Sequence, residues 1–250
     1  MKTNIQSSVV PIIVTQELTK KYDNSIALDS LCLSINKGEI FGFLGHNGAG
    51  KTTTVSMLTT LIAPTSGSAS VCGFDTQKES IEVQKCIGYL PENVKFYDSL
   101  TAYENLEYLA KLSGVKNPKE KINEVLMFLE FDDVEKKKLG EFSKGMRQRI
   151  GIAQAILHDP EVLFLDEPTS GLDPMGIKNL RKIIIKLNRE KGMTIFMNTH
   201  LLSEVAKTCT TIGVLNQGKL IYRDSLVHTM ERFHDESSLE EIYFTLGDKH

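Results

Sequence analysis

Residues 45–52 read Gly-His-Asn-Gly-Ala-Gly-Lys-Thr and fit the pattern G-x-x-x-x-G-K-[ST]. The glycines let the backbone adopt positive φ angles and approach a ligand closely, because they carry no Cβ. Backbone N–H groups then converge on phosphate oxygens, and the start of the following helix adds partial positive charge. In this pattern Lys51 reaches the β- and γ-phosphates of a nucleotide, and the Thr52 hydroxyl binds Mg²⁺. The stretch predicts a site for a nucleoside triphosphate with Mg²⁺, although a glycine-rich loop of this length can also match by chance.

Two carboxylates and a histidine follow apolar strands later in the chain. Residues 162–165 form an unbroken apolar run that ends at Asp166, as expected for a central parallel strand buried on both faces. Asp166 is placed to hold Mg²⁺, and Glu167 to orient and polarise an attacking water as a general base. His200 follows the apolar strand 194–197, so it should face the same crevice and hydrogen-bond the γ-phosphate. The alternative is two solvated acids that close a strand and a histidine with a structural role only.

A second candidate anion site begins at Ser143. Ser143 is a good helix cap, and Gly145 in the first helical turn leaves backbone amides bare. A helix start of this kind binds anions. Because residues 45–52 already form a complete phosphate cradle, the second site makes sense if it completes the site of another molecule.

The elements that position these residues begin with strands. Residues 10–35 show short apolar alternations broken by turn residues, which predicts an antiparallel strand group leading into the strand 39–44. Tyr22 lies at an exposed turn of this group, where it could stack on an adenine ring or simply pack halfway into the surface. Helical apolar spacing follows the glycine-rich loop, and residues 69–74 predict another short strand.

A helical stretch then interrupts the strands from about 93 to 158. Thr101 and Glu104 form a capping box, and Asn117 with Pro118 begins the next helix. Strands resume after this stretch and end in a predicted hairpin around Asn216-Gln217-Gly218. We therefore predict an ATPase domain over 1–222 with an inserted helical subdomain at about 93–158. A charged and partly helical tail is predicted over 223–250.

Composition is that of an ordinary globular protein. The chain has 250 residues, of which 41% are hydrophobic and 24% charged, enough for one sizeable core. The formal net charge of −3 gives no sign of a nucleic-acid-binding surface. Four scattered cysteines without a C-x-x-C pair predict reduced thiols in a cytosolic protein rather than structural zinc. Residues 1–6 lack the features of a signal peptide, and no apolar run approaches the length of a membrane span, so any membrane role is expected to come from a partner.

In order and spacing, the motifs resemble those of ABC ATPases, the nucleotide-binding subunits of ABC transporters, over nearly the whole chain. The matching positions are the adenine-stacking aromatic (Tyr22), the Walker A loop (Gly45, His46, Asn47, Gly48, Ala49, Gly50, Lys51, Thr52 and Thr53), the Q-loop (Glu92), the signature (142–146), Walker B (165–168), the D-loop (170–173) and the switch histidine (His200). The resemblance implies an α/β fold of the P-loop NTPase (RecA-like) class. Its mostly parallel sheet core would carry an N-terminal antiparallel β subdomain and an inserted α-helical subdomain.

The resemblance also implies roles and partners. Tyr22 and the Walker A residues would bind ATP in one subunit, while Ser143 and Gly145 complete the site of the other subunit in a head-to-tail dimer. Thr52, Glu92 and Asp166 would hold Mg²⁺. Catalysis would fall to Glu167, His200 and Lys51. The dimer, formed with an identical chain or with another ABC ATPase, would drive an integral-membrane permease from the cytoplasmic side of the cell membrane, as a peripheral subunit.

Two departures from the family pattern narrow the prediction. Glu92 stands where most relatives have glutamine, and the signature has Lys144 for glycine and Met146 for glutamine. These departures, together with residues 238–243 of the tail, resemble the exporter branch that includes daunorubicin-resistance and sodium-efflux ATPases. The predicted task is export of a drug, lipid, ion or polysaccharide, with the cargo recognised by the membrane subunit.

Two other functions remain open at this point. A soluble ABC ATPase acting on ribosomes or nucleic acid would be expected to carry a second ATPase domain, a long coiled coil or a zinc module, and the acidic balance argues against DNA. A nucleotide-dependent switch with little hydrolysis is disfavoured by the joint presence of Thr52, Asp166, Glu167 and His200. The permease is predicted to dock around residues 94–97, unless the aromatic residues there pack inside the helical subdomain.

Overall fold

The computed structural model describes residues 10–131 and 137–233, so residues 238–243 of the tail lie outside the described ranges. One of its two sheets is antiparallel and has the strand order β2-β1-β4-β5. Its strands are β1 (Pro11–Tyr22), β2 (Ser25–Asn36), β4 (Ser66–Val71) and β5 (Phe74–Asp75). The predicted N-terminal antiparallel group is confirmed. The single strand predicted over 69–74 is wrong, because Cys72 and Gly73 turn the chain with φ angles of 54° and 84° and split the segment into β4 and β5.

The other sheet has the order β10-β9-β3-β8-β7-β6 and is parallel except for β10. Its strands are β3 (Ile40–Leu44), β6 (Ile87–Leu90), β7 (Val162–Asp166), β8 (Thr194–Thr199), β9 (Thr211–Asn216) and β10 (Lys219–Ser225). The predicted hairpin joins β9 to β10. Both of its turn residues, Gln217 and Gly218, have positive φ angles of 45° and 80°, which a tight two-residue hairpin turn requires.

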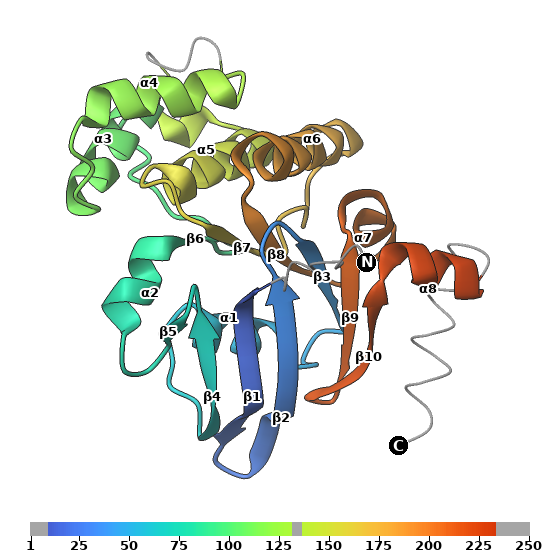
Figure 1. Ribbon diagram of the computed structural model, residues 1–250. Helices are drawn as coiled ribbons and strands as arrows, with labels where there is room; N and C mark the ends of the chain where they lie inside the picture. The colour runs from blue at the N-terminus through green and yellow to red at the C-terminus, as the bar shows by residue number, and fades with distance from the viewer. Residues whose placement is uncertain (1–9, 132–136, 234–250) are drawn as a thin grey trace, which may run out of the picture.

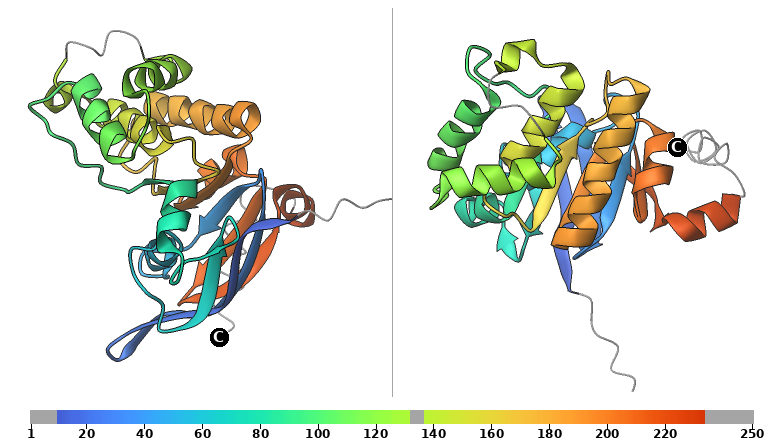
Figure 2. Two further views of the ribbon diagram at one scale, coloured as in Figure 1. Left: turned by 60° about the vertical axis from the view of Figure 1, so that its left-hand side comes forward. Right: turned by 90° about the horizontal axis from the view of Figure 1, so that it is seen from above.

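Each face of the parallel sheet is covered by a different layer. Toward the antiparallel sheet, the rings of Phe41, Phe43, Phe164 and Phe196 pack on one another and beside helix α1 (Lys51–Leu58). On the opposite face, alternate residues of β7 and β8 pack against helices. Figure 2 shows this layered arrangement from two further directions. Because both faces are covered, β7 reads as a continuous apolar run in the sequence.

The helical layer forms the upper part of the molecule in Figure 1 and includes the predicted insertion. It contains α3 (Ala102–Leu112), α4 (Pro118–Phe128), the short 3₁₀ helix η1 (Leu139–Glu141) and α5 (Lys144–Ile156). The capping box at Thr101 and Glu104 is confirmed, since both of its hydrogen bonds are present. Ser143 caps α5 as predicted and accepts a hydrogen bond from the Met146 backbone N–H.

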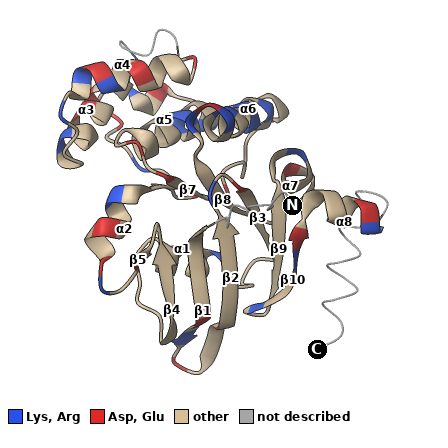
Figure 3. Cartoon of the chain, viewed as in Figure 1, with Lys and Arg blue, Asp and Glu red and all other residues tan. Residues whose placement is uncertain are grey.

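The remaining helices connect and flank the strands. They are α2 (Ser80–Cys86), α6 (Pro174–Lys191), α7 (Leu202–Thr208) and α8 (Leu226–Phe233). In Figure 3 the positions of Lys, Arg, Asp and Glu are concentrated in the outer helices, whereas most of the strand ribbons are tan. Within the described ranges, no helix combines the length and the apolar character needed to cross a membrane.

Candidate active site

The carboxyl ends of three neighbouring parallel strands bring the predicted site residues to one edge of the sheet. The last residue of β3, Leu44, is level with Thr199 of β8, and Asp166 of β7 is level with Asn198 of β8. The Walker A loop follows Leu44, Glu167 follows Asp166, and His200 follows Thr199. In open α/β sheets this edge is where ligands bind.

The Walker A loop has the backbone conformation that its glycines permit. Gly48 and Gly50 have φ angles of 84° and 107°. A Cβ on Gly50 would lie 2.3 Å from the carbonyl oxygen of Ala27, and a Cβ on Gly45 would lie 2.8 Å from that of Leu215. Neither position tolerates a side chain without a shift of the backbone, which explains why the sequence has glycine at both.

The β9–β10 hairpin braces this loop from the side. The Gly218 N–H donates a hydrogen bond of 2.9 Å to the Ala49 carbonyl oxygen. His46 Nε2 lies 3.1 Å from Asn216 Oδ1, and its Nδ1 lies 2.7 Å from the Asn47 carbonyl oxygen. The His46 ring therefore helps to hold the loop in place. Asn216 supports this ring, although the sequence patterns indicated it only as part of the hairpin.

Lys51 lies within the loop, where it is only 5% exposed. Its ammonium donates hydrogen bonds to the carbonyl oxygens of Gly45, at 2.6 Å, and His46, at 3.2 Å. It also lies 3.5 Å from Glu167 Oε1. The one positive charge thus faces both the predicted phosphate cradle and the predicted general base.

The residues predicted to hold Mg²⁺ supply hard oxygen ligands. Thr52 Oγ1 lies 3.3 Å from Asp166 Oδ1, so one hydroxyl and one carboxylate oxygen meet at the start of α1. In the described part of the chain, no cluster of three or more acidic, histidine or cysteine side chains could bind a metal by itself. The pair of Thr52 hydroxyl and Asp166 carboxylate fits Mg²⁺, which keeps several waters and is bound by one or two protein groups together with substrate phosphates. When bound, Mg²⁺ supplies positive charge that neutralises phosphate oxygens.

Burial sets the electrostatics around Asp166. It raises the pKa of the Asp166 carboxyl above its ordinary value, and the neighbouring carboxylates of Glu167 and Glu92 act in the same direction. Tyr89 OH lies 3.5 Å from Asp166 Oδ2. Burial and the Asp166 charge raise the pKa of Tyr89 to about 12, so its phenol stays protonated beside the carboxylate. A site of this kind favours the approach of a cation.

Glu167 is held in an unusual backbone conformation. Its φ angle is 45°, in the left-handed region that non-glycine residues rarely adopt. The Glu167 N–H lies 3.1 Å from the backbone carbonyl oxygen of Asn198 and 2.9 Å from its side-chain Oδ1, so both can accept from it. Strained backbone of this kind concentrates at functional sites.

The Glu167 carboxylate has a different environment at each oxygen. Oε2 lies 2.9 Å from His200 Nδ1. Oε1 is buried, meets Lys51 only as an ion pair, and is not satisfied by a hydrogen bond within the described structure. An oxygen that is held in place but still able to accept a proton is what a general base requires.

Three predicted site residues lie apart from this centre or only near it. Ser143 and Gly145 lie at the start of α5, where a Cβ on Gly145 would be 3.9 Å from Leu172 of the D-loop. Glu92 accepts a hydrogen bond from Ser170 Oγ at 3.5 Å, and its charge acts on Asp166 from a distance. The structure therefore places the signature with the D-loop, and Glu92 between the D-loop and Asp166.

Tyr22 and Thr53 lie on the elements next to the loop. Tyr22 is at the β1–β2 turn and pairs with Ser25, two residues before the Ala27 carbonyl that touches Gly50. Its ring is partly exposed, with Lys20 Nζ 5.1 Å from the ring centre. An accessible aromatic face at this point is compatible with stacking on a base, and the adenine contact stays a prediction. Thr53 is half-buried in the first turn of α1.

Asn198 is the functional candidate that sequence reasoning missed. It is fully buried at the end of β8, directly opposite Asp166 in the sheet register. The available signal was a polar residue inside an apolar strand, two positions before His200. Such a residue indicates a buried hydrogen-bond requirement.

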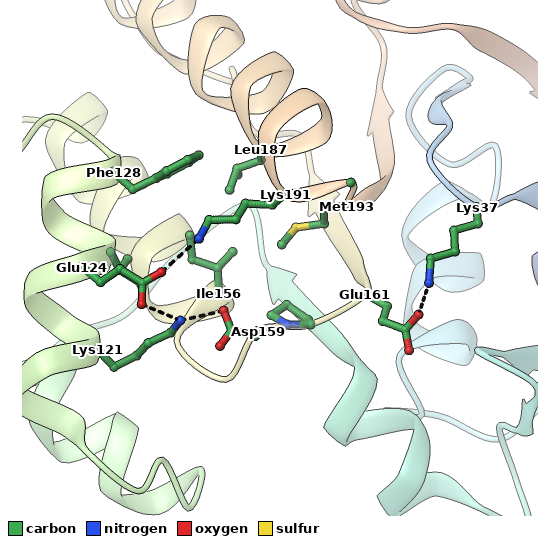
Figure 4. Close-up of a pocket in the computed structure, with 13 residues that line it drawn as sticks. Lys37, Lys121, Glu124, Phe128, Ile156, Asp159, Glu161, Leu187, Lys191 and Met193 are labelled. Carbon is green, nitrogen blue, oxygen red and sulfur yellow. Dashed lines mark hydrogen bonds and ion pairs between the residues drawn. The ribbon is translucent and has the colours of Figure 1, made fainter.

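A separate cavity of about 190 Å³ lies at the other end of the parallel strands (Figure 4). Phe128, Ile156 and Leu187 form apolar walls, and charged residues surround them. Lys121 bonds to both Asp159 and Glu124, and Lys191 bonds to Glu124 across the opening. None of the predicted catalytic residues lines this cavity, so its shape does not bear on the predicted chemistry.

Comparison with known proteins agrees with the geometry of the carboxyl edge. Residues 28–170 match the family described as ABC transporter. The bacitracin transport ATP-binding protein BcrA of Bacillus licheniformis is 45% identical over 221 residues, which cover 88% of this chain and 72% of that protein.

Solved structures resemble the whole described fold. The ATP-binding subunit of an ABC transporter superposes with a TM-score of 0.81 at 27% identity, covering 94% of this chain and 99% of that one. The ATP-binding cassette MJ0796, solved as a dimer in a post-hydrolysis state with ADP and phosphate, gives a TM-score of 0.76 at 25% identity. That match covers 86% of this chain and 98% of the cassette. The α/β fold with a P-loop sheet core is confirmed by these neighbours.

Proposed function

The chain is an ATP-binding, ATP-hydrolysing member of the ABC transporter family, and from this premise we propose that it powers export across a membrane through a separate permease. The observation that carries the catalytic part is the arrangement of Glu167, which is clamped by Asn198 at its backbone and by His200 and Lys51 at its carboxylate. Export as the direction of transport is supported by the similarity to a protein of Bacillus subtilis named for linearmycin resistance, which is 37% identical over 212 residues.

In the proposed mechanism each residue at the carboxyl edge has a distinct task. The Walker A backbone and Lys51 hold the β- and γ-phosphates of ATP. Glu167 takes a proton from the attacking water through Oε1, and His200 contacts the γ-phosphate and keeps the carboxylate oriented through Oε2. Oε1 accepts no hydrogen bond in the described structure and meets only the Lys51 ammonium at 3.5 Å, so it can accept one from the reacting water.

We further propose that Thr52 and Asp166 hold Mg²⁺. Both oxygens lie at the mouth of the loop, and the raised pKa of Asp166 reflects a carboxylate whose charge is incompletely compensated by the protein. Glu92, the third residue predicted to hold Mg²⁺, contacts Ser170 through its carboxylate, and its part in metal binding stays a prediction. The division into an ATPase domain over 1–222 and a tail over 223–250 is retained as part of the proposal, with β10 extending to Ser225.

The proposed active assembly is a head-to-tail dimer, formed by two copies or with a related ATPase. Gly145 lies beside Leu172 of the D-loop, and Ser143 caps the helix that carries it. A second chain facing the Walker A loop would bring its own α5 start to the γ-phosphate, which explains why one chain carries two phosphate-binding features.

The permease is proposed to dock beside the Q-loop. Phe96 is half-buried against the core, with Arg147 over its ring, so it serves the packing of the subdomain. Tyr97 is 56% exposed and forms an edge-to-face pair with Tyr108, which is 47% exposed, with ring centres 5.7 Å apart. Exposed aromatic residues with polar tips are typical of protein interfaces. Docking there would hold the chain at the cytoplasmic face of the membrane as a peripheral subunit.

Capture of the partner tests this proposal. The Glu167→Gln chain, expressed at its natural level with Mg-ATP, should stay closed around ATP and copurify with a polytopic membrane protein from solubilised membranes. The same variant carrying Tyr97→Ser is the matched control and should capture less of that protein. Recovery of ribosomes or nucleic acid without any membrane protein would contradict the transport function.

A further inference from the structure

The D-loop (170–173) lies between two opposite charges. On one side, Ser170 Oγ donates a hydrogen bond of 3.5 Å to Glu92 Oε1. On the other side, a Cβ placed on Gly171 would lie only 2.7 Å from Lys144 Nζ, so the ammonium is in contact with the loop backbone. A carboxylate and an ammonium thus touch consecutive residues of one turn.

Helix α5 connects both sides of this arrangement. Lys144 and Gln148 are four residues apart on the helix, so they lie on one face. Gln148 is only 2% exposed, and its Nε2 donates a hydrogen bond of 3.3 Å to the Glu92 carbonyl oxygen. The same helix face therefore fixes the backbone that carries Glu92 and presents the ammonium to Gly171.

Lys144 has no competing acidic partner in the part of the chain that the structure describes. Its neighbour in the first turn of α5, Arg147, is paired with Asp98 at 2.6 Å, whereas no carboxylate lies within ion-pair distance of Lys144. The Lys144 ammonium therefore forms no ion pair in the described structure and contacts the D-loop instead.

The D-loop in turn is connected to the predicted general base. The Ser170 N–H donates a hydrogen bond of 3.0 Å to the Glu167 carbonyl oxygen. Glu167 and Gly171 both have positive φ angles, 45° and 67°, so the segment between them is a tight turn with little freedom. A displacement of Ser170 and Gly171 would therefore rotate the Glu167 backbone.

We propose that Glu92 and Lys144 are positioning residues that clamp the D-loop from opposite sides and thereby set the orientation of Glu167. The proposal rests on the proposed function, because it concerns the rate of hydrolysis at the same site. It gives a common structural role to Glu92 and Lys144, two charged departures from the family pattern that sequence reasoning had linked only through resemblance to one exporter branch. Neither residue has to touch the reacting atoms.

Steady-state phosphate release and binding of a fluorescent ATP analogue, both measured on the full chain, test the clamp. Lys144→Met removes the charge and keeps most of the side-chain stem. Its kcat should fall by about fivefold while KM and analogue affinity change by less than about twofold, the pattern of a lost transition-state contribution. Lys144→Arg should recover most of the rate. Lys119→Met, an exposed lysine in the first turn of α4, is the matched control and should keep the wild-type rate.

The Glu92→Gln variant separates the clamp from direct metal binding. If Glu92 acts on the D-loop, the variant lowers kcat without moving the Mg²⁺ concentration for half-maximal rate. The rate loss of the double variant Glu92→Gln with Lys144→Met should then be smaller than the product of the two single losses, because both act on one loop.

Several results would overturn the clamp. These are a wild-type kcat for Lys144→Met, a loss that arginine does not rescue, fully multiplicative losses in the double variant, or a shifted Mg²⁺ midpoint for Glu92→Gln. Absence of hydrolysis by the wild-type chain would instead overturn the proposed function itself, so the two failures are distinguishable.

Discussion

The two ends of the parallel sheet differ in how their charged side chains are compensated. At the amino end, Glu161 pairs with Lys37, and Glu124 pairs with both Lys121 and Lys191 around the cavity of Figure 4. These hydrogen bonds hold the pKa of Glu124 below its usual value and raise that of Lys37, so they favour the charged forms. At the carboxyl end, burial raises the pKa of Asp166 and disfavours its charge.

This difference indicates that the amino end stabilises the fold, whereas the carboxyl end is arranged for ligand binding. At the amino end, Lys191 of α6 pairs with Glu124 of α4, and Lys121 of α4 pairs with Asp159 in the loop before β7, so these pairs join helices to each other and to the sheet. At the carboxyl end, Glu167 Oε1 has no hydrogen-bond partner in the described structure, the Asp166 carboxylate meets the neutral hydroxyls of Thr52 and Tyr89, and Glu167 is held in a strained conformation. Incomplete compensation costs stability and leaves the groups available to a ligand.

The largest expected effect comes from a glycine substitution at the carboxyl end. Gly50→Ala forces a Cβ against the Ala27 carbonyl in a backbone with φ of 107°. It should weaken ATP binding by about 100-fold, equivalent to one or two lost charge-assisted hydrogen bonds. Gly192→Ala, at the amino end, also has positive φ but meets no neighbouring atom within 4 Å. It should cost about 1 kcal/mol of stability and leave ATP affinity unchanged. If both variants lose ATP affinity equally in a titration with ATP, the proposed difference between the two ends of the sheet is wrong.

A change in the cavity wall should have an effect of similar size, but on stability instead of ATP binding. Leu187 is fully buried and lines the cavity at the amino end. Leu187→Ala should lower the free energy of unfolding by about 2–5 kcal/mol, because it removes packed methyl groups and enlarges an existing void. Below the unfolding temperature, kcat for ATP should stay near the wild-type value. Denaturant unfolding and phosphate release measure the two quantities, and a large kcat loss in folded protein would show that the two ends are coupled.

A pair of matched asparagines gives an intermediate effect. Asn198→Ala removes the side-chain acceptor of the Glu167 N–H and should lower kcat about tenfold, the value of roughly one hydrogen bond. Asn188 also uses its amide at the amino end, where Nδ2 donates to the carbonyl oxygens of Gly38 and Met193. Asn188→Ala should lower the unfolding temperature without reducing kcat. If both variants reduce kcat alike, Asn198 is a structural residue only.

The smallest expected effect is a gain in stability at the active edge. Because the pKa of Asp166 is raised in the folded state, its contribution to stability is lost as pH rises above the ordinary value of 3.8 and through the folded pKa. Asp166→Asn should therefore melt at a higher temperature than the wild type near pH 7, without nucleotide or Mg²⁺. The gain should shrink as pH is lowered toward about 4. A variant that is less stable at every pH would show that the carboxylate stabilises the fold.

Much of this organisation could be predicted from the sequence. Some elements are recognisable from a few consecutive residues. Glycines identify the Walker A loop and the hairpin at Asn216, and a continuous apolar run identifies the strand before Asp166. Cap residues such as Thr101 were predictable for the same reason.

What could not be predicted depends on contacts distant in sequence. Asn198 meets Glu167 only because β7 and β8 pair in one register, and Lys144 meets Gly171 only because α5 packs on the D-loop. The charge pairs of the amino end likewise join Lys121 of α4 to Asp159 in the loop before β7, two positions that no periodicity relates. Tertiary register, rather than any local pattern, decides these partners.

The account depends most directly on Glu167, and comparison of phosphate release by the wild-type chain and by Glu167→Gln is the most direct test. ATP affinity should be retained in the variant, while the hydrolysis rate should fall by at least about 100-fold, the typical contribution of a general base. A variant that binds ATP and hydrolyses it at the wild-type rate would show that Glu167 is not the base and that the carboxyl edge works by another arrangement.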